Sequence, residues 1–266
     1  MICFPNAKIN IGLHITEKRS DGYHTIETIF YPIPLTDALE AIKSCETSFK
    51  QTGKKLDSSP EENLVMKAYD LMSKKYNIPP LKIYLRKAIP SGAGLGGGSA
   101  DAAFALKLIN DLCECDIPIE KLEKTASSIG ADCPFFIHNK PVIATGTGNI
   151  FKHSDISLQG YTIYVVKPPV AVSTKEAYSN VKPQKPEFSL EELPSLPVNE
   201  WKNVLKNDFE PSVFEKYPII GEIKEKLYSL GAEYSAMSGS GSAVYGLFKK
   251  TISPKFTDCF VWKGTL

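Results

Sequence analysis

The sequence predicts an α+β fold with two lobes. Segments with the period of strands alternate with segments with the period of helices through the first half of the chain. The second half holds a strand, a proline-rich stretch, a helix and two further strands. A chain of 266 residues can form one large domain or two small ones. We predict two domains, residues 1–150 and 151–266, with the boundary near residues 145–160.

The elements of the first half follow from the spacing of apolar residues. In residues 8–15 the apolar side chains alternate with Lys8, Asn10 and His14, and this period of two predicts a half-buried strand. The other expected elements are strands over 25–31 and 81–85 and helices over 62–76, 99–113 and 119–129.

A tight connection is expected after the helix over residues 119–129. Gly130 stands where a helix of this kind ends. The apolar run 134–137 then predicts a short strand, so that Ala131-Asp132-Cys133 joins a helix to a strand.

The second half is punctuated by prolines and glycines. Residues 161–166 have the pattern of a strand, and the prolines between 183 and 197 predict an irregular connection. The expected elements after it are a helix over 219–230 that ends at Gly231, and two strands over 234–236 and 243–248 joined by the Ser-Gly segment 238–242.

Composition excludes several classes of protein. The 31 Lys and Arg nearly balance the 30 Asp and Glu, and without a basic block this argues against a nucleic-acid partner. No apolar run approaches the roughly 18 residues of a membrane span, and residues 1–14 lack the apolar core of a signal peptide. The six scattered cysteines and four histidines argue against a zinc site. We expect free thiols in a reducing cytoplasm, and no membrane partner.

The strongest local signal is a glycine-rich loop, with five glycines in residues 92–98. Glycine at this density lets bare backbone approach a ligand closely. A mostly apolar helix follows, and the free N–H groups and dipole at its N-terminus form an anion site beside the glycines. A flexible linker is the weaker interpretation, because linkers are polar on both sides.

Other glycine-rich motifs fit this loop less well. The Walker pattern requires Gly-Lys-Ser/Thr, but the first lysine after the loop is Lys107, inside the helix. Gly92, Gly94 and Gly97 match the dinucleotide fingerprint, which leaves a dinucleotide oxidoreductase as a distant alternative. The protein-kinase motifs and the Gly-x-Ser-x-Gly elbow of α/β-hydrolases are missing from the sequence.

Three motifs, in this order, resemble those of the GHMP kinases, the family of galactokinase and of the homoserine, mevalonate and phosphomevalonate kinases. Residues 5–10 resemble the family's N-terminal strand, residues 90–100 its nucleotide loop, and residues 238–243 its C-terminal glycine-rich loop. The resemblance spans nearly the whole chain. It implies a two-lobed GHMP kinase fold, with an N-terminal lobe like the second domain of ribosomal protein S5 and a ferredoxin-like C-terminal lobe.

Segments 21–24, 130–136 and 207–210 resemble the branch of the family that acts on a cytidyl-bearing sugar alcohol. This resemblance implies a kinase of isoprenoid precursor synthesis that transfers phosphate from ATP, with Mg²⁺, to the 2-hydroxyl of that substrate. The expected partners are the small-molecule cytidyl substrate and ATP, and the expected state is a monomer or a weak homodimer. Ala100, Cys133 and Tyr178 depart from residues common in relatives, and none of them removes a charged group.

The resemblance assigns the nucleotide loop to ATP. Its backbone N–H groups would hold the phosphates, and the hydroxyl of Ser99 would reach Mg²⁺. The ATP-binding residues are Pro90, Ser91, Gly92, Ala93, Gly94, Leu95, Gly96, Gly97, Gly98, Ser99 and Ala100.

The resemblance also assigns the acid–base chemistry. Asp132 is the candidate base for the acceptor hydroxyl, although an Asp in a turn is by itself equally well a polar turn residue. Lys8 is its partner, whose charge would keep Asp132 ionised and stabilise the developing alkoxide. Asn10 lies on the same strand face and would hold Asp132 or the substrate hydroxyl.

Six residues remain as candidates for substrate binding. The resemblance assigns Tyr23 and Tyr178 to the two faces of the cytosine, where an aromatic ring can stack, and His24 to its edge. Without the resemblance, an exposed aromatic residue in a hairpin is the favoured interpretation of Tyr23 and His24. Thr174 is assigned to a substrate hydroxyl or phosphate. Gly239 and Ser240 are assigned to the diphosphate or the transferred phosphoryl group, although residues 238–242 are equally compatible with a plain hairpin loop.

Two other functions remain open at this point. A GHMP kinase for mevalonate, homoserine or a sugar would lack a pyrimidine for Tyr23 and His24 to recognise. A non-enzymatic nucleotide-binding regulator would bind ATP without turnover, and the presence of Lys8 and Asp132 argues against it.

Overall fold

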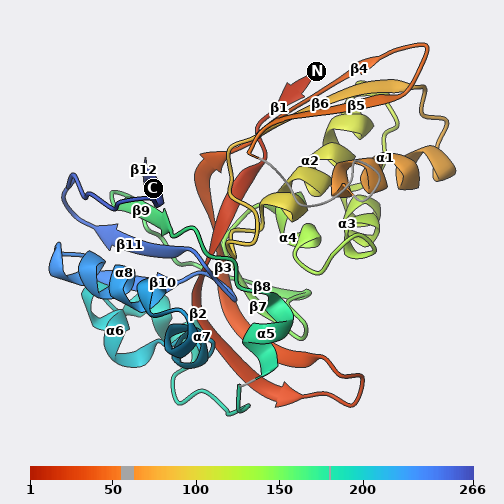
Figure 1. Ribbon diagram of the computed structural model, residues 1–266. Helices are drawn as coiled ribbons and strands as arrows, with labels where there is room; N and C mark the ends of the chain where they lie inside the picture. Colours follow the sequence, from red (N-terminus) through yellow and green to blue (C-terminus); the bar gives the residue numbers. More distant parts are fainter. Residues whose placement is uncertain (55–62, 180) are drawn as a thin grey trace. The chain divides into compact units, whose positions relative to one another are not determined.

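A computed structural model describes residues 1–54, 63–179 and 181–266 of the chain, and it confirms the α+β class (Figure 1). The chain forms two compact units that are interleaved in sequence. The first unit comprises Met1–Ala7, Leu35–Ser91 and Gly96–Lys140, and the second comprises Lys8–Pro34, Gly92–Leu95 and Pro141–Leu266. The linear division at residue 150 stays a prediction.

The first unit is a sheet with helices packed on it. Its strand order in the described part of the chain is β1 (Ile2–Cys3), β4 (Ala38–Lys43), β6 (Leu81–Lys87) and β5 (Ser48–Gly53). Only the pair β5 and β6 is parallel among these. The helices are α1 (Leu64–Lys75), α2 (Gly97–Leu112), α3 (Ile119–Ser127) and α4 (Cys133–His138). Helix α2 is central, because it contacts α1, α3, α4 and β4.

Most elements of this unit follow the predicted spacing. Strand β6 alternates buried Leu81, Ile83 and Leu85 with more exposed residues. Helix α2 buries most of its alanines and leucines, as an apolar helix in a core does. Helix α1 lies within the predicted span 62–76, of which residue 62 falls outside the described residues.

The strand predicted over residues 134–137 is wrong, because these residues form helix α4. Pro134 lies in the first turn of α4, where its missing N–H removes no intrahelical hydrogen bond. A short apolar run does not distinguish a buried strand from a buried helix, and here the proline decides for the helix. The turn that contains Asp132 therefore joins two helices.

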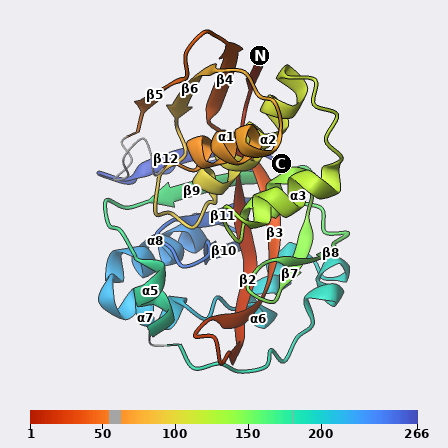
Figure 2. The same cartoon turned by 90° about the vertical axis from the view of Figure 1, so that its right-hand side faces the viewer.

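The second unit contains two sheets. One is β2 (Asn6–Lys18), β3 (His24–Thr36), β7 (Val142–Thr145) and β8 (Ile150–His153), and most of β2 and β3 belongs to this unit. Figure 2 shows β2 and β3 as long neighbouring strands. The other sheet is β10 (Tyr234–Met237), β11 (Val244–Phe248), β9 (Thr162–Lys167) and β12 (Phe260–Thr265). All its described pairs are antiparallel.

Short helices complete the second unit. They are α5 (Thr174–Ser179), α6 (Trp201–Val204), α7 (Glu210–Lys216) and α8 (Pro218–Ser229), with 3-10 turns at Leu190–Ser195 and Val198–Glu200. Helix α8 packs on β10 and β11 and ends before Gly231, whose φ of +96° confirms the predicted glycine cap. The predicted strands over 234–236 and 243–248 form an antiparallel pair.

Strand β2 differs from the prediction in its burial. Residues 7–15 are all buried, so the face that carries Lys8, Asn10 and His14 is covered as well as the apolar face. Burying polar side chains is costly unless they have partners. The alternation in the sequence therefore marks an apolar face and a buried polar face, and the polar face belongs to the candidate site.

None of the helices in the described residues is both long enough and apolar enough to cross a membrane.

Candidate active site

The glycine-rich loop adopts the backbone conformations that its glycines allow. Gly92, Gly94 and Gly96 have φ values of +58°, +72° and +69°, which side chains rarely tolerate. Gly96 is also the N-cap of α2. Since glycine has no side-chain oxygen, the first-turn N–H groups of this 16-residue helix receive no side-chain cap from it. The first turn of α2 therefore offers backbone donors of the kind that bind a phosphate group.

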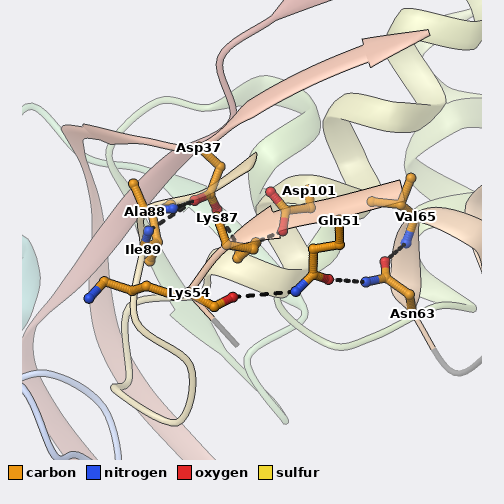
Figure 3. A network of polar contacts seen from close by, with 9 residues as sticks. All are labelled: Asp37, Gln51, Lys54, Asn63, Val65, Lys87, Ala88, Ile89 and Asp101. Atoms are coloured by element: carbon orange, nitrogen blue, oxygen red, sulfur yellow. Dashed lines mark hydrogen bonds and ion pairs between the residues drawn. The ribbon is translucent and has the colours of Figure 1, made fainter. Parts of the chain in front are cut away.

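A buried charge cluster ties together the two flanks of this loop within the first unit (Figure 3). Lys87, just before the loop, donates to Asp101 in α2 at 2.6 Å and also to Asp37. Asp37 accepts in turn from the backbone N–H groups of Ala88 at 2.5 Å and Ile89 at 2.9 Å. Because all three charged side chains are at most 3% exposed, this cluster fixes where the loop leaves β6 and enters α2.

Burial changes the protonation of this cluster. It raises the pKa of the Asp101 carboxyl to about 8, and the charge of Asp37 adds to the rise while Lys87 opposes it. A single ammonium shared by two buried carboxyls leaves one negative charge uncompensated, so a proton on one carboxyl is favoured. The raised pKa favours the protonated form of the Asp101 carboxyl near neutral pH.

The middle of the loop lies against the second glycine-rich loop, within the second unit. The hydroxyl of Ser238 donates to the carbonyl of Gly94 at 2.8 Å. The backbone N–H groups of Ser242 and Ala243 donate to Gly92 and Ala93 at 3.3 and 3.2 Å. The structure thus brings together two loops that the sequence analysis predicted separately for ATP and for substrate.

Asn207 holds the second loop in place, a role that sequence reasoning missed. Its side-chain amide donates to the carbonyls of Met237 and Gly239, both at 2.8 Å, and its oxygen accepts from the N–H of Phe209. Glu210 adds a further contact by accepting from the N–H of Met237 at 2.9 Å. The segment 207–210 was visible as a motif, but only the folded chain shows which backbone it binds.

Lys8 and Asn10 form a buried polar chain on β2. The ammonium of Lys8 donates to Asn10 Oδ1 at 2.5 Å and lies 4.5 Å from the ring centroid of Phe30. The backbone of Asn10 is fixed at both ends, since its N–H donates to Ser238 Oγ and its carbonyl accepts from the hydroxyl of Tyr245. The two β2 residues predicted for the site therefore lie together, next to the second glycine-rich loop.

Asp132 belongs to the first unit and forms the N-cap position of α4, where its side chain makes no capping hydrogen bond. Close by, a Cβ on Gly130 would lie 3.3 Å from the Cys133 sulfur and 4.0 Å from the Ser99 hydroxyl. Burial raises the pKa of the Cys133 thiol to about 11, and a hydrogen bond with Ser99 opposes this rise. The structure therefore places the turn of Asp132 beside the first turn of α2. The pairing of Asp132 with Lys8 stays a prediction.

The residues predicted for the cytidyl group all lie in the second unit. The ring of His24 stacks on that of Tyr178 at 4.9 Å between centroids, whereas Tyr23 is 67% exposed. Burial lowers the pKa of His24, with Lys18 contributing. Tyr178 also meets Phe209 edge to face, and Thr174 lies 3.4 Å from Ser240 between hydroxyl oxygens. Tyr178 and His24 thus form an aromatic pair, and their contact with a cytosine stays a prediction.

The described side chains provide few ligands for a divalent metal ion. Within the described residues no group of three or more His, Cys, Asp or Glu side chains could hold a metal ion. Mg²⁺ usually binds through substrate phosphates, waters and one or two protein oxygens. The hydroxyl of Ser99 at the start of α2 fits that kind of site.

Profiles of one family match two parts of the chain. The family model described as "GHMP kinases N terminal domain" matches residues 63–140, and the model described as "GHMP kinases C terminal" matches residues 190–256. The chain belongs to the GHMP kinase family, and the fold expected from the motifs is confirmed.

Full-length relatives have a more specific name. The chain is 61% identical to the 4-diphosphocytidyl-2-C-methyl-D-erythritol kinase of Parabacteroides distasonis and 54% identical to that of Bacteroides thetaiotaomicron, over 100% of both chains in each case. A crystal structure of 4-(cytidine 5'-diphospho)-2C-methyl-D-erythritol kinase matches with a TM-score of 0.79 and 31% identity, covering 93% of this chain and 90% of that one. The Methanococcus jannaschii mevalonate kinase, at 15% identity and a TM-score of 0.66, shares the fold.

Proposed function

We propose that this chain is an ATP-dependent kinase that phosphorylates the 2-hydroxyl of 4-diphosphocytidyl-2-C-methyl-D-erythritol, in isoprenoid precursor synthesis. The products are the 2-phosphate and ADP. The glycine-rich loop with positive φ at Gly92, Gly94 and Gly96, which runs into the N-terminus of α2, carries the kinase assignment, because such a backbone can approach and bind phosphate groups. Full-length identity of 61% to a kinase named for that substrate supports the choice of acceptor.

ATP binds at residues 90–100 in this proposal. The N–H groups of the loop and of the first turn of α2 receive the phosphates, and the helix dipole favours their charge. The buried cluster of Lys87, Asp37 and Asp101 supports this role, because it holds both flanks of the loop rigid before ATP arrives. A rigid phosphate cradle lowers the barrier by positioning, which is the main protein contribution to phosphoryl transfer.

The acceptor hydroxyl is deprotonated by Asp132. The oxygen of the acceptor hydroxyl attacks the γ-phosphorus of ATP, and the bond between that phosphorus and the bridging oxygen to the β-phosphate breaks. The hydroxyl proton passes to the Asp132 carboxylate. Lys8 stabilises the negative charge that develops on the acceptor oxygen. The buried contact of Lys8 with Asn10 supports this role, since it holds the ammonium in one place.

Mg²⁺ accompanies ATP, and Ser99 is the residue that would hold it. When bound, the ion supplies positive charge to the phosphate oxygens. The cytidyl group is recognised by Tyr23, His24 and Tyr178, and the substrate diphosphate by Thr174, Gly239 and Ser240. The six free thiols support a reducing, cytoplasmic setting for the reaction.

ADP release by the purified protein, with Mg-ATP and a panel of acceptors, tests the proposal. The panel offers 4-diphosphocytidyl-2-C-methyl-D-erythritol beside mevalonate, homoserine and galactose. We expect turnover with the cytidyl substrate alone, and competition by CMP. Turnover with another acceptor would support kinase activity but overturn the assignment of the substrate. Folded protein that binds ATP without any turnover would favour a non-enzymatic regulator.

A further inference from the structure

A third polar residue, on β3, completes the chain of hydrogen bonds that begins at Lys8. Thr28 is fully buried, at 0% exposure. Its hydroxyl donates to the carbonyl of Gly12, and it accepts from Asn10 Nδ2 at 3.1 Å. Asn10 Oδ1 in turn accepts from the ammonium of Lys8 at 2.5 Å. The chain therefore runs from Lys8 through Asn10 and Thr28 to Gly12, and all four residues belong to the second unit.

The direction of every bond in this chain follows from its two ends. The carbonyl of Gly12 can only accept, so the single hydroxyl proton of Thr28 is used there. The hydroxyl oxygen then has only acceptor capacity left, and it meets a donor in the amide NH₂ of Asn10. The ammonium of Lys8 can only donate, and it requires the amide oxygen.

Loss of the Thr28 hydroxyl would release the amide of Asn10. A turned amide would put NH₂ against the ammonium of Lys8, two donors face to face. A Cβ built on Gly239 would lie 3.2 Å from Asn10 Oδ1, so a change at the amide reaches the second glycine-rich loop.

We propose that Thr28 is a positioning residue of the phosphoryl transfer: its hydroxyl orients the amide of Asn10 and thereby holds the ammonium of Lys8. This inference rests on the proposed function. Thr28 touches neither substrate nor nucleotide in it and acts only through Asn10. Threonine is common in strands, so nothing in the sequence distinguishes Thr28 from other strand residues.

Steady-state kinetics of Thr28→Val and Thr28→Ser test the proposal. Valine keeps the shape and removes the hydroxyl, whereas serine keeps the hydroxyl. We expect Thr28→Val to lower kcat about tenfold, the effect of one buried hydrogen bond, with little change in KM for ATP. Thr28→Ser should retain most of the wild-type kcat. Thr125→Val is the matched control, because Thr125 is also buried and its hydroxyl donates to a carbonyl, that of Lys121.

A double-mutant cycle separates positioning from stability. If Thr28 acts through Asn10, then Thr28→Val in an Asn10→Ala background should cost no further kcat. Unfolding midpoints of all variants are measured alongside, and if Thr28→Val does not fold, Thr28→Ala takes its place against Thr28→Ser.

The outcomes separate this inference from the proposed function. If the wild type phosphorylates the cytidyl substrate but Thr28→Val and Thr28→Ser have equal kcat, only the role of Thr28 is overturned. Additive effects on kcat in the double-mutant cycle would overturn it as well. Wild-type protein that does not phosphorylate the cytidyl substrate would overturn the proposed function and this role together.

Discussion

Gly94 lies so close to the backbone of Ser238 that no side chain fits at Gly94. A Cβ on Gly94 would lie 1.8 Å from the carbonyl oxygen of Ser238. The same two residues share a hydrogen bond of 2.8 Å from the serine hydroxyl to the glycine carbonyl. The nucleotide loop and the second glycine-rich loop therefore depend on each other for their positions.

Replacement of Gly94 by alanine should uncouple the two loops. The φ of +72° would strain an alanine by about 1–2 kcal/mol, and the new methyl group would also push the backbone of Ser238 away. Displacement of a binding group by about 1 Å can cost on the order of 100-fold in rate, and we expect a loss of this size in kcat/KM for ATP.

Gly92→Ala is the matched control for that experiment. Gly92 also has a positive φ, of +58°, but a Cβ there would meet nothing within 4 Å. It should lose much less activity than Gly94→Ala. Equal losses for the two variants would mean that backbone strain, and not the contact with Ser238, limits the loop.

Asp132→Asn should remove the base while leaving ATP binding nearly intact. General-base catalysis contributes roughly 10²–10⁴-fold, so kcat should fall by that factor. The dissociation constant for ATP should stay within about threefold, because the amide keeps the shape of the carboxylate. Asp155→Asn, at an exposed aspartate paired with His153, provides the control. A kcat for Asp132→Asn near that of the wild type would leave positioning alone to account for the rate.

Asp101 should make the folded state less stable as pH rises. Its pKa is raised to about 8 by burial, so the folded chain holds a proton that the unfolded chain loses near pH 4. The stability that this proton provides is present below about pH 4 and is lost as pH rises towards 8, by on the order of 1 kcal/mol per pH unit.

Urea unfolding between pH 5 and pH 8 measures this effect. Asp101→Asn carries no titratable proton, so its stability should change less with pH than that of the wild type. Asp111→Asn, at an exposed aspartate on the same helix, should keep the wild-type slope. Parallel curves for the wild type and Asp101→Asn would show that Asp101 is ionised throughout.

Tyr178 should bind the cytidyl group through its ring. Stacking of a base on an aromatic side chain is worth about 1–3 kcal/mol. Tyr178→Ala should therefore raise KM for the cytidyl substrate and the inhibition constant of CMP by roughly 5- to 100-fold, with KM for ATP little changed. Tyr178→Phe keeps the ring that packs on His24 and Phe209 and should behave like the wild type. Unchanged CMP inhibition in Tyr178→Ala would remove Tyr178 from the base site.

Local sequence patterns predicted the elements whose formation depends on apolar spacing and turn residues. The helix after the glycines, the Gly231 cap and the antiparallel pair of β10 and β11 follow from spacing and turn residues. A four-residue apolar run has no period that separates a helix from a strand, and the position of Pro134 in the first turn of α4 is visible only in the folded chain.

The contacts that build the candidate site join residues far apart in the chain, which local patterns do not reveal. The sequence marked Gly94 and Ser238 as members of two loops, but not as neighbours. It placed Lys8 and Asn10 on one strand face, which the structure confirms, but gave no sign that Thr28 completes their hydrogen bonds. Asp37 lies 50 residues before Lys87, and neither stood out as a partner in the sequence.

Identification of the phosphorylated product tests the central claim most directly. The purified protein is incubated with Mg-ATP and 4-diphosphocytidyl-2-C-methyl-D-erythritol, and the product is examined by ³¹P NMR. The account predicts one new phosphomonoester, on the 2-hydroxyl, for each ADP formed. ADP accompanied only by inorganic phosphate, or a phosphomonoester on another hydroxyl, would contradict it.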